Sequence, residues 1–423
     1  MKINTFVLLF LLPLIWSCEK LVNVDTPQNQ LTADKVYADT AILMGALANT
    51  YSLFDRTIDP NFNKYLALYA GELSYSGSNP QAKEFAAASL STTNGIVLNI
   101  WQNFYFAIYQ CNDLIEHATL PQIVAEAKFL RAFSYYYLVN SFGNVPLLLT
   151  TNVNQNVLAF RTDAAVVYLQ IIKDLNDAKN TLPEIYPSEG RVRVNKWAAA
   201  ALLSRIYLEQ QDWELAVSNA TEIINTGLYT PLEEPSGVFL AGSKESILQF
   251  WTQNGFISDA PNLVPSGAGQ YSLSRELAAS FEPADLRSKF WSKSMSTGPN
   301  TLLYPYKYRS TAQIISPAEY LSALRISEQY LIRAEARIHL TDLPGAITDL
   351  NVIRERAGLT DLSNSLSESA CYVALEKEWK TEFFAEWGHG FINLKRSGAL
   401  KKLLPIPQNE ITYNNNLTQN TGY

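Results

Sequence analysis

The sequence is poor in the residues that metal and disulfide sites require. Among 423 residues there are three cysteines and three histidines. The cysteines form no CxxC pattern, and no histidines stand at an HExxH or other ligand spacing. We therefore predict no disulfide framework, no metal centre and no cofactor. Cys111 and Cys371 fall within expected helices and are interpreted as small buried hydrophobic residues.

Signatures of catalysis are also missing. The chain has no GxSxG motif, so it lacks a hydrolase nucleophile elbow. The GxG from Gly267 to Gly269 lacks the third glycine and the strand and helix context of a phosphate loop. Glu233 and Glu234 are adjacent acids in an expected loop, where carboxylates are usually solvated. We predict that the protein is not an enzyme; the enzymatic alternative would release new reducing ends from a polysaccharide.

Positive charge is in short supply. Lysine and arginine number 33 against 40 aspartates and glutamates, a formal charge of −7. This balance argues against a nucleic acid partner, because phosphate backbones are bound by clustered cations. With 47% hydrophobic and 17% charged residues, the chain is too apolar for a disordered protein. It is predicted to fold as a globular protein.

The first 17 residues have the features of a signal segment. Lys2 precedes an apolar run from Phe6 to Trp16, which is shorter than the roughly 20 residues of a membrane-spanning helix. The run ends in IWSC, which resembles a bacterial lipobox that ends at Cys18. The resemblance implies a signal peptide over 1–17, a lipid on the Cys18 thiol and a tether over 18–32. The alternative is an ordinary secretory signal with an incidental cysteine.

Helical periodicity dominates the remaining chain, 33–423, which is predicted to be a single body. Three pairs of helices have the spacing of tetratricopeptide hairpins, with breaks at Pro121, at Gln211 to Asp212 and at Asp342 to Gly345. Asp163 is expected to cap a further helix. These predictions rest on apolar residues at helical spacing. They are Trp101 to Ala118 with Gln122 to Phe142; Ala199, Leu202, Leu203, Ile206 and Tyr207 with Trp213, Ala216, Val217, Ala220 and Ile224; Tyr330, Ala334 and Ile338 with Ala346, Leu350, Ile353 and Ala357; and Ala165, Tyr168, Leu169 and Ile172 after Asp163.

Two long stretches differ from the helical part in composition. Residues 55–95 and 228–317 are rich in Gly, Pro, Ser, Asn and aromatic residues, and are predicted to be loop-rich insertions. Strand-like runs occur from Glu245 to Trp251 and from Tyr304 to Tyr308. The predicted fold class is thus mainly α, with helical hairpins, long irregular loops and a few short strands. Trp101, Trp197, Trp213 and Trp379 stand at helical spacing and are assigned to the core.

Four long motifs carry a resemblance to a known family. Residues 125–148 read AEAKFLRAFSYYYLVNSFGNVPLL, residues 325–340 read RISEQYLIRAEARIHL, and residues 374–398 read ALEKEWKTEFFAEWGHGFINLKRSG. Together with LLPIPQNEITYNNNLTQNTGY from Leu403, these segments closely resemble the SusD/RagB family of Bacteroidetes outer-membrane lipoproteins. The third segment departs from the family block, with Gly390 for the usual Arg, Ile392 for Phe and Asn393 for Asp.

The resemblance implies a function as well as a fold. Such proteins have a superhelical tetratricopeptide-like scaffold, lie at the cell surface, and bind oligosaccharides for a SusC-like TonB-dependent transporter. The implied partners are this transporter, an oligosaccharide or polysaccharide, and the outer membrane through the lipid anchor. The alternative within the family is a binder of peptide, glycoprotein or other non-glycan cargo.

The resemblance also indicates where a ligand would bind. In this chain the corresponding loops are residues 72–95 and 251–291, in which aromatic rings can stack on pyranose faces and polar side chains can pair with hydroxyl groups. Trp251 and Trp291 have an alternative role, which is to hold long loops on the scaffold. The candidate glycan-binding residues are Tyr75, Asn79, Trp251, Asn254, Phe256, Asp259, Tyr271 and Trp291.

Overall fold

The computed structural model describes residues 37, 39–265, 269–297, 300–312 and 316–423. The predicted signal peptide, Cys18 and the tether lie outside the described residues. Helices make up most of the described chain, as predicted, and strands are few and short. The helices are α2 Thr40–Leu53, η2 Phe54–Ile58, α3 Asp59–Tyr69, α4 Pro80–Ala86, α5 Gly95–His117, α6 Pro121–Phe142, α7 Val153–Asn156, α8 Ala164–Thr181, α9 Lys196–Glu209, α10 Trp213–Asn225, α11 Ala260–Leu263, α12 Arg275–Ser280, α13 Leu286–Trp291, α14 Ile326–His339, α15 Leu343–Arg356, α16 Glu368–Phe383, α17 His389–Arg396 and α18 Gln408–Tyr413.

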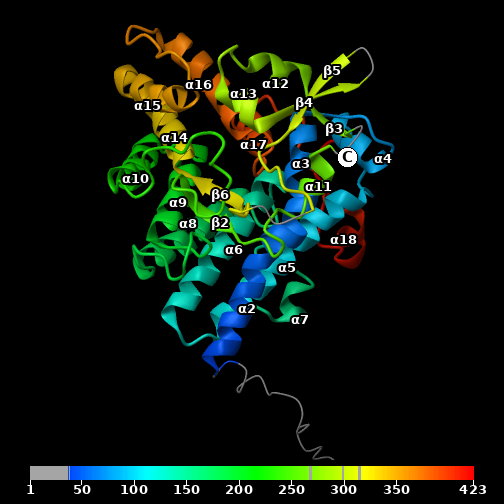
Figure 1. Cartoon of the computed structure of the whole chain (residues 1–423). Helices are drawn as coiled ribbons and strands as arrows, with labels where there is room; N and C mark the ends of the chain where they lie inside the picture. Colours follow the sequence, from blue (N-terminus) through cyan, green and yellow to red (C-terminus); the bar gives the residue numbers. More distant parts are fainter. Residues whose placement is uncertain (1–36, 38, 266–268, 298–299, 313–315) are drawn as a thin grey trace, which may run out of the picture.

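The three predicted hairpins are confirmed as the pairs α5–α6, α9–α10 and α14–α15. Asp212 and Asp342 begin the second helix of the latter two pairs, where their carboxylates accept hydrogen bonds from the amides of Leu215 and Gly345. The helices pack in series, α6 on α8, α8 on α9 and α10 on α14. Figure 1 shows this stack from α5 and α6 in cyan to α15 in gold.

Helix α8 is present as predicted, and its N-terminus is capped by the Asp163 carboxylate, which accepts from Ala165 N at 2.8 Å. The predicted buried stripe, however, is wrong by part of a turn. Leu169 is 67% exposed, whereas the buried face is made by Val167, Tyr168, Ile171, Leu175 and Ala178. Tyr168 belongs to both the predicted stripe and the observed buried face, so this residue alone could not show which stripe is buried.

The prediction that residues 55–95 form a loop-rich insertion is wrong for much of the segment, which contains η2, α3 and α4. Pro60, the second residue of α3, has no amide hydrogen to donate, and it comes directly after η2, which runs into α3 without a break. Gly71, at φ +74°, ends the helix, and the amides of Gly71 and Glu72 bond to the carbonyls of Leu68 and Ala67.

Residues 228–317 contain only short elements, in agreement with the prediction. Of three two-stranded antiparallel sheets, two pair this insertion with strands outside it, and the third, β4 with β5, lies within it. The predicted strand from Glu245 to Trp251 is confirmed, but the strand predicted from Tyr304 to Tyr308 ends at Pro305 and begins earlier. The sheets pair β1 Leu73–Tyr75 with β3 Tyr271–Leu273, β2 Ser246–Phe250 with β6 Leu321–Arg325, and β4 Ser292–Thr297 with β5 Asn300–Pro305.

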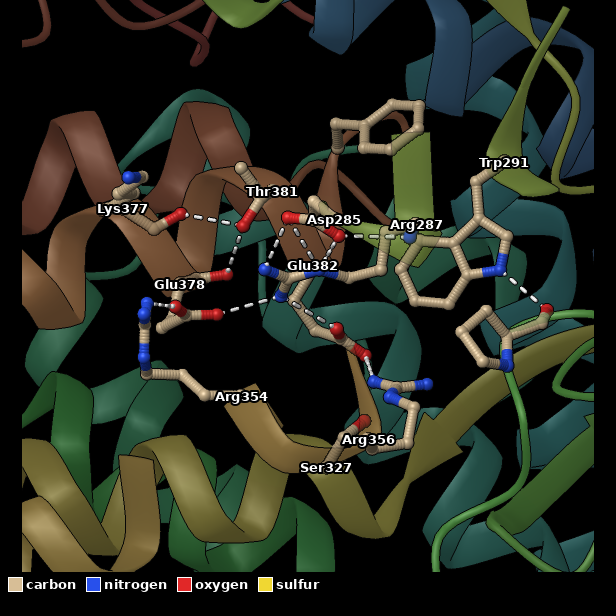
Figure 2. A network of polar contacts seen from close by, with 12 residues as sticks. Asp285, Arg287, Trp291, Ser327, Arg354, Arg356, Lys377, Glu378, Thr381 and Glu382 are labelled. Carbon is tan, nitrogen blue, oxygen red and sulfur yellow. Dashed lines mark hydrogen bonds and ion pairs between the residues drawn. The ribbon is translucent and has the colours of Figure 1, made fainter. Parts of the chain in front are cut away.

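A buried network of ion pairs joins this insertion to the last helices (Figure 2). Arg287 of α13 pairs with Glu378 of α16 at 2.8 Å, and Arg354 of α15 contacts the other oxygen of Glu378 at 3.0 Å. Glu382 accepts from Arg356, from Arg287 and from Arg325. Burial raises the pKa of Glu382, but the three guanidinium groups outweigh this and hold it well below its ordinary value.

The apolar side chains form one contiguous core that extends from Leu43 in α2 to Leu417 after α18. Trp101, Trp197 and Trp379 are buried in it as predicted, but Trp213 is only partly buried. Cys111 and Cys371 are buried and free, which agrees with their interpretation as small hydrophobic residues. Across the described residues, every helix is too short or too polar to cross a membrane.

Candidate functional site

A cavity of about 420 Å³ lies beside the sheet of β1 and β3, which joins residues 55–95 to residues 228–317. Tyr75 and Tyr271 stand opposite each other in the register of this sheet, with ring centroids 5.0 Å apart and planes inclined by 42°. Helix α3 and the segment around α11 supply the remaining walls. The principal side chains lining the cavity are Lys64, Tyr65, Tyr75, Asn79, Asn262, Gln270 and Tyr271.

The Tyr75 ring is held in place by its hydroxyl group. This group donates to Gln270 Oε1 at 3.3 Å and accepts from the Asn79 amide at 3.1 Å. Asn79 in turn caps α4, because its side chain accepts from the amide of Gln81. Gly77 lies so close to the Tyr75 hydroxyl that an added Cβ would be only 2.3 Å from it. The turn from β1 into α4 therefore fixes the ring at the cavity wall.

Asp259 does not line the cavity, but it contacts Lys64 and Asn262, which do. It is fully buried and pairs with Lys64, and it accepts from Asn262 Nδ2 at 2.8 Å. Burial raises its pKa, although Lys64 opposes the rise. The prediction that Asp259 offers its carboxylate to a ligand hydroxyl is therefore wrong for this structure, and its role is to position Lys64 and Asn262.

Trp251 does not line the cavity beside Tyr75. Its side chain is 49% exposed and lines a separate hollow of about 240 Å³, whose walls include Leu47 and Tyr51 of α2 and Arg193. Asn254 is exposed and Phe256 is partly exposed, but neither lines the cavity at Tyr75. The structure thus does not bring these three candidates together with Tyr75.

Trp291 is buried, with 1% of its surface exposed, and its indole donates to the carbonyl of Pro235 at 2.7 Å (Figure 2). Lys307 and Arg356 lie over its ring, 4.9 and 5.1 Å from the centroid. The prediction that Trp291 extends a sugar platform is wrong for this structure. The alternative applies, because the ring holds the 228–317 insertion against the scaffold.

Four polar or aromatic side chains that line the cavity were not predicted as site residues. Lys64 and Tyr65 lie in α3, a segment that the sequence interpretation placed in a loop, whereas Asn262 and Gln270 lie within the predicted 251–291 range. Lys64 lies over the rings of Tyr65 and Tyr271, 5.0 and 6.0 Å from their centroids. Burial raises the pKa of Tyr271 well above its ordinary value, so its hydroxyl stays protonated.

The cavity therefore combines tyrosine rings, amide groups and one lysine. Among the described residues, no group of three or more His, Cys, Asp or Glu side chains is arranged to hold a metal ion. The available chemistry is stacking on ring faces and hydrogen bonding to a polar ligand. The chain thus belongs to a class of proteins in which a scaffold of helical hairpins carries a cavity formed with its loops.

Comparison with known families identifies this class. Residues 55–208 match the family model described as "Starch-binding associating with outer membrane", and residues 291–403 match the model of the SusD family. The chain belongs to the SusD/RagB family, as its motifs predicted.

The curated relatives are distant. SusD-like protein P25 of Formosa agariphila is 26% identical over 281 residues, which cover 60% of this chain and 52% of that protein. The starch-binding protein SusD of Bacteroides thetaiotaomicron is 29% identical over 141 residues, 27% of this chain and 24% of that one. At best, the matched part therefore spans about half the length of these relatives.

Solved structures agree in fold over nearly the whole chain. A SusD superfamily protein from Bacteroides vulgatus superposes with a TM-score of 0.79 at 20% identity, over 92% of this chain and all of the other. A structure described as a laminarin-binding SusD-like protein superposes with a TM-score of 0.75 at 24% identity, over 91% of this chain and all of that one.

Proposed function

We propose that this protein binds an oligosaccharide in the cavity lined by Tyr75 and Tyr271. The observation that supports this most directly is the paired tyrosine wall of β1 and β3, surrounded by amide side chains. A pyranose ring stacked on a tyrosine removes its apolar C–H face from water and leaves its equatorial hydroxyls free. Asn79, Asn262 and Gln270 lie where such hydroxyls need partners.

Lys64 supplies a charge at the same wall. Its side chain is 4% exposed and is neutralised by Asp259 behind it, so the cavity offers an ammonium donor without a strong positive field. This arrangement suits the hydroxyl groups of a neutral glycan. The laminarin-binding relative supports a β-glucan as the first ligand to try.

Calorimetry with laminarihexaose and maltoheptaose tests this function. Tyr75→Ala should weaken binding by about 1 to 3 kcal/mol, or roughly 5- to 150-fold, as truncation of an aromatic hot spot does. Tyr413→Ala is the control, because this tyrosine of α18 is 78% exposed and lies outside the cavity. If Tyr75→Ala keeps its thermal stability and binds like the wild type, the cavity is not the glycan site.

We further propose that the 33–423 body is a single unit tethered to the outer membrane at Cys18, facing the cell exterior, and that it delivers its ligand to a SusC-like transporter. The support is the family membership and the lipobox-like segment. The two proteins should co-purify in mild detergent when both are expressed. Recovery of this protein always alone, with an intact transporter present, would contradict delivery to that partner.

A further inference from the structure

A second cavity, larger than the first, is lined by side chains of α14, α16 and α17 and so lies on the helical scaffold. Its volume is about 630 Å³, within the roughly 300 to 1,000 Å³ of small-molecule sites. It shares no lining residue with the cavity at Tyr75. The proposed glycan site does not account for it.

The mouth of this cavity is an aromatic stack. Trp213, the first residue of α10, lies parallel to His339 at the end of α14, with ring centroids 3.9 Å apart and planes inclined by 6°. The hydroxyl of Tyr372 lies 3.1 Å from His339 Nδ1. These contacts orient a partly exposed indole that no described element covers completely.

The inner wall combines a ring with paired charges. Trp379 is 6% exposed and donates from Nε1 to Glu335 Oε2 at 2.9 Å. Arg396 contacts the other oxygen of Glu335 at 3.0 Å and donates to Asn393 Oδ1 at 2.9 Å. Glu335 and Arg396 thus hold each other in place at the cavity wall.

On the opposite wall of the cavity, residue 390 is a glycine, and the absence of a side chain there leaves room for the Glu72 carboxylate. A Cβ at Gly390 would lie 2.4 Å from Glu72 Oε1, so any side chain there must displace the Glu72 carboxylate. Glu72 is 6% exposed and its Oε2 accepts from the amide of Ala385 at 3.1 Å. Within the described part of the chain, no hydrogen-bond donor reaches its Oε1. The cavity wall therefore contains a carboxylate oxygen that is open to a donor from a ligand.

We propose that this cavity binds a neutral saccharide of one or two pyranose units. Its charged side chains balance, with Lys380 and Arg396 against Glu335 and Glu376, while Glu72 is charged only above about pH 7, so an anionic ligand would gain nothing overall. Aromatic rings at the mouth and on the inner wall provide apolar faces. Glu72 Oε1 and Lys380 are available to hydroxyl groups.

The test is ¹⁹F NMR of protein labelled with 5-fluorotryptophan, titrated with cellobiose, maltose and laminaribiose at millimolar concentration. Trp213→Phe and Trp379→Phe assign the two resonances. At least one disaccharide should shift both resonances and leave that of Trp251 unchanged. Gly390→Arg fills the cavity and should weaken this response at least about tenfold.

Two further variants keep the outcome decisive. Trp213→Ala changes a partly exposed residue, so it should fold even if Gly390→Arg does not, and it should weaken the shift of Trp379 to a similar extent. Tyr75→Ala should leave the response intact, which separates this proposal from the glycan site. The proposal is overturned if no disaccharide moves Trp213 and Trp379, if only an amine such as phenylalaninamide does so, or if folded Trp213→Ala responds like the wild type.

Discussion

At the scale of single residues, Glu72 makes stability depend on pH. Burial raises its pKa from 4.5 to about 7, although Lys307 and Lys380 oppose the rise. The folded protein therefore holds a proton that the unfolded chain releases above pH 4.5, and stability contributed by the neutral acid is lost as the pH rises toward 7.

We predict that Glu72→Gln gains stability relative to the wild type between pH 5 and pH 8, because its amide cannot ionise. The difference should approach roughly 2 to 3 kcal/mol over this interval, at about 1.4 kcal/mol for each pKa unit. Denaturant titrations of both proteins at the two pH values measure it. Equal pH dependence in the two proteins would show that Glu72 is ionised in the fold throughout.

Glu382 is the residue on which the buried ion pairs depend most. Arg287, Arg325 and Arg356 all contact its carboxylate, so removing its charge takes a partner from three buried guanidinium groups at once. Glu382→Gln should cost about 3 to 5 kcal/mol of unfolding free energy, as breaking a buried pair does. Glu376→Gln, on the exposed side of the same helix, is the control and should change it by less than about 1 kcal/mol. Comparable losses in both variants would contradict this role.

The sequence predicted part of the candidate site. Tyr75, Asn79 and Tyr271 could be named because the resemblance to the SusD/RagB family indicated the loops 72–95 and 251–291, which contain these aromatic and polar side chains. Trp291 could not be distinguished from them, because its burial depends on Pro235 and on cations distant in the sequence. Lys64 was missed because its function depends on Asp259, 195 positions away.

At the scale of elements, the π-helical turn η2 before α3 contacts the segment that forms one wall of the proposed glycan cavity. It places Asp55 beneath the segment that leads into α11, where its carboxylate accepts from Ser258 N at 3.0 Å and from Ser258 Oγ at 2.9 Å. Such π-helical turns are rare and frequently lie at functional sites. The turn therefore links the scaffold to the wall that contains Asn262.

Asp55→Ala should loosen this wall without touching the ligand. We expect an unfolding free energy lower by about 1 to 3 kcal/mol, faster amide hydrogen exchange over residues 257–263, and weaker glycan binding. Asp177→Ala removes an exposed partner of Lys128 and should change stability by less than about 1 kcal/mol. Unchanged exchange in folded Asp55→Ala would show that η2 does not support the wall.

The hairpins could be predicted because their signals are local. Ala-rich stripes, an aspartate cap on each second helix and short turns specify α9–α10 and α14–α15 within about 30 residues each. Helix α3 was missed although Pro60 and Gly71 mark its ends, because its Asn and Tyr content is also typical of loops. Its buried side chains pack on partners from α5, β1 and α17, which no local pattern reveals.

At the scale of the whole molecule, the helical stack and the irregular insertion have separate tasks. The stack provides the contiguous core, while buried charges such as Arg287 and Glu378 fix the insertion to it. A loop-borne cavity can then vary in ligand without disturbing the scaffold. This division explains how chains near 20% identity retain one fold over almost their full length.

The proposed attachment of this body to a membrane depends on Cys18. Two or three acyl chains anchor a protein stably, because each buried CH₂ contributes about 0.8 kcal/mol, and one chain alone binds only marginally. Cys18→Ala should therefore release the protein from the outer membrane or leave an uncleaved precursor, with Cys111 and Cys371 unable to substitute because they are buried. Metabolic labelling with a palmitate analogue, followed by membrane fractionation, measures both effects. Labelling that persists unchanged in Cys18→Ala would mean that the lipid is attached elsewhere and that the segment before Cys18 is an ordinary secretory signal.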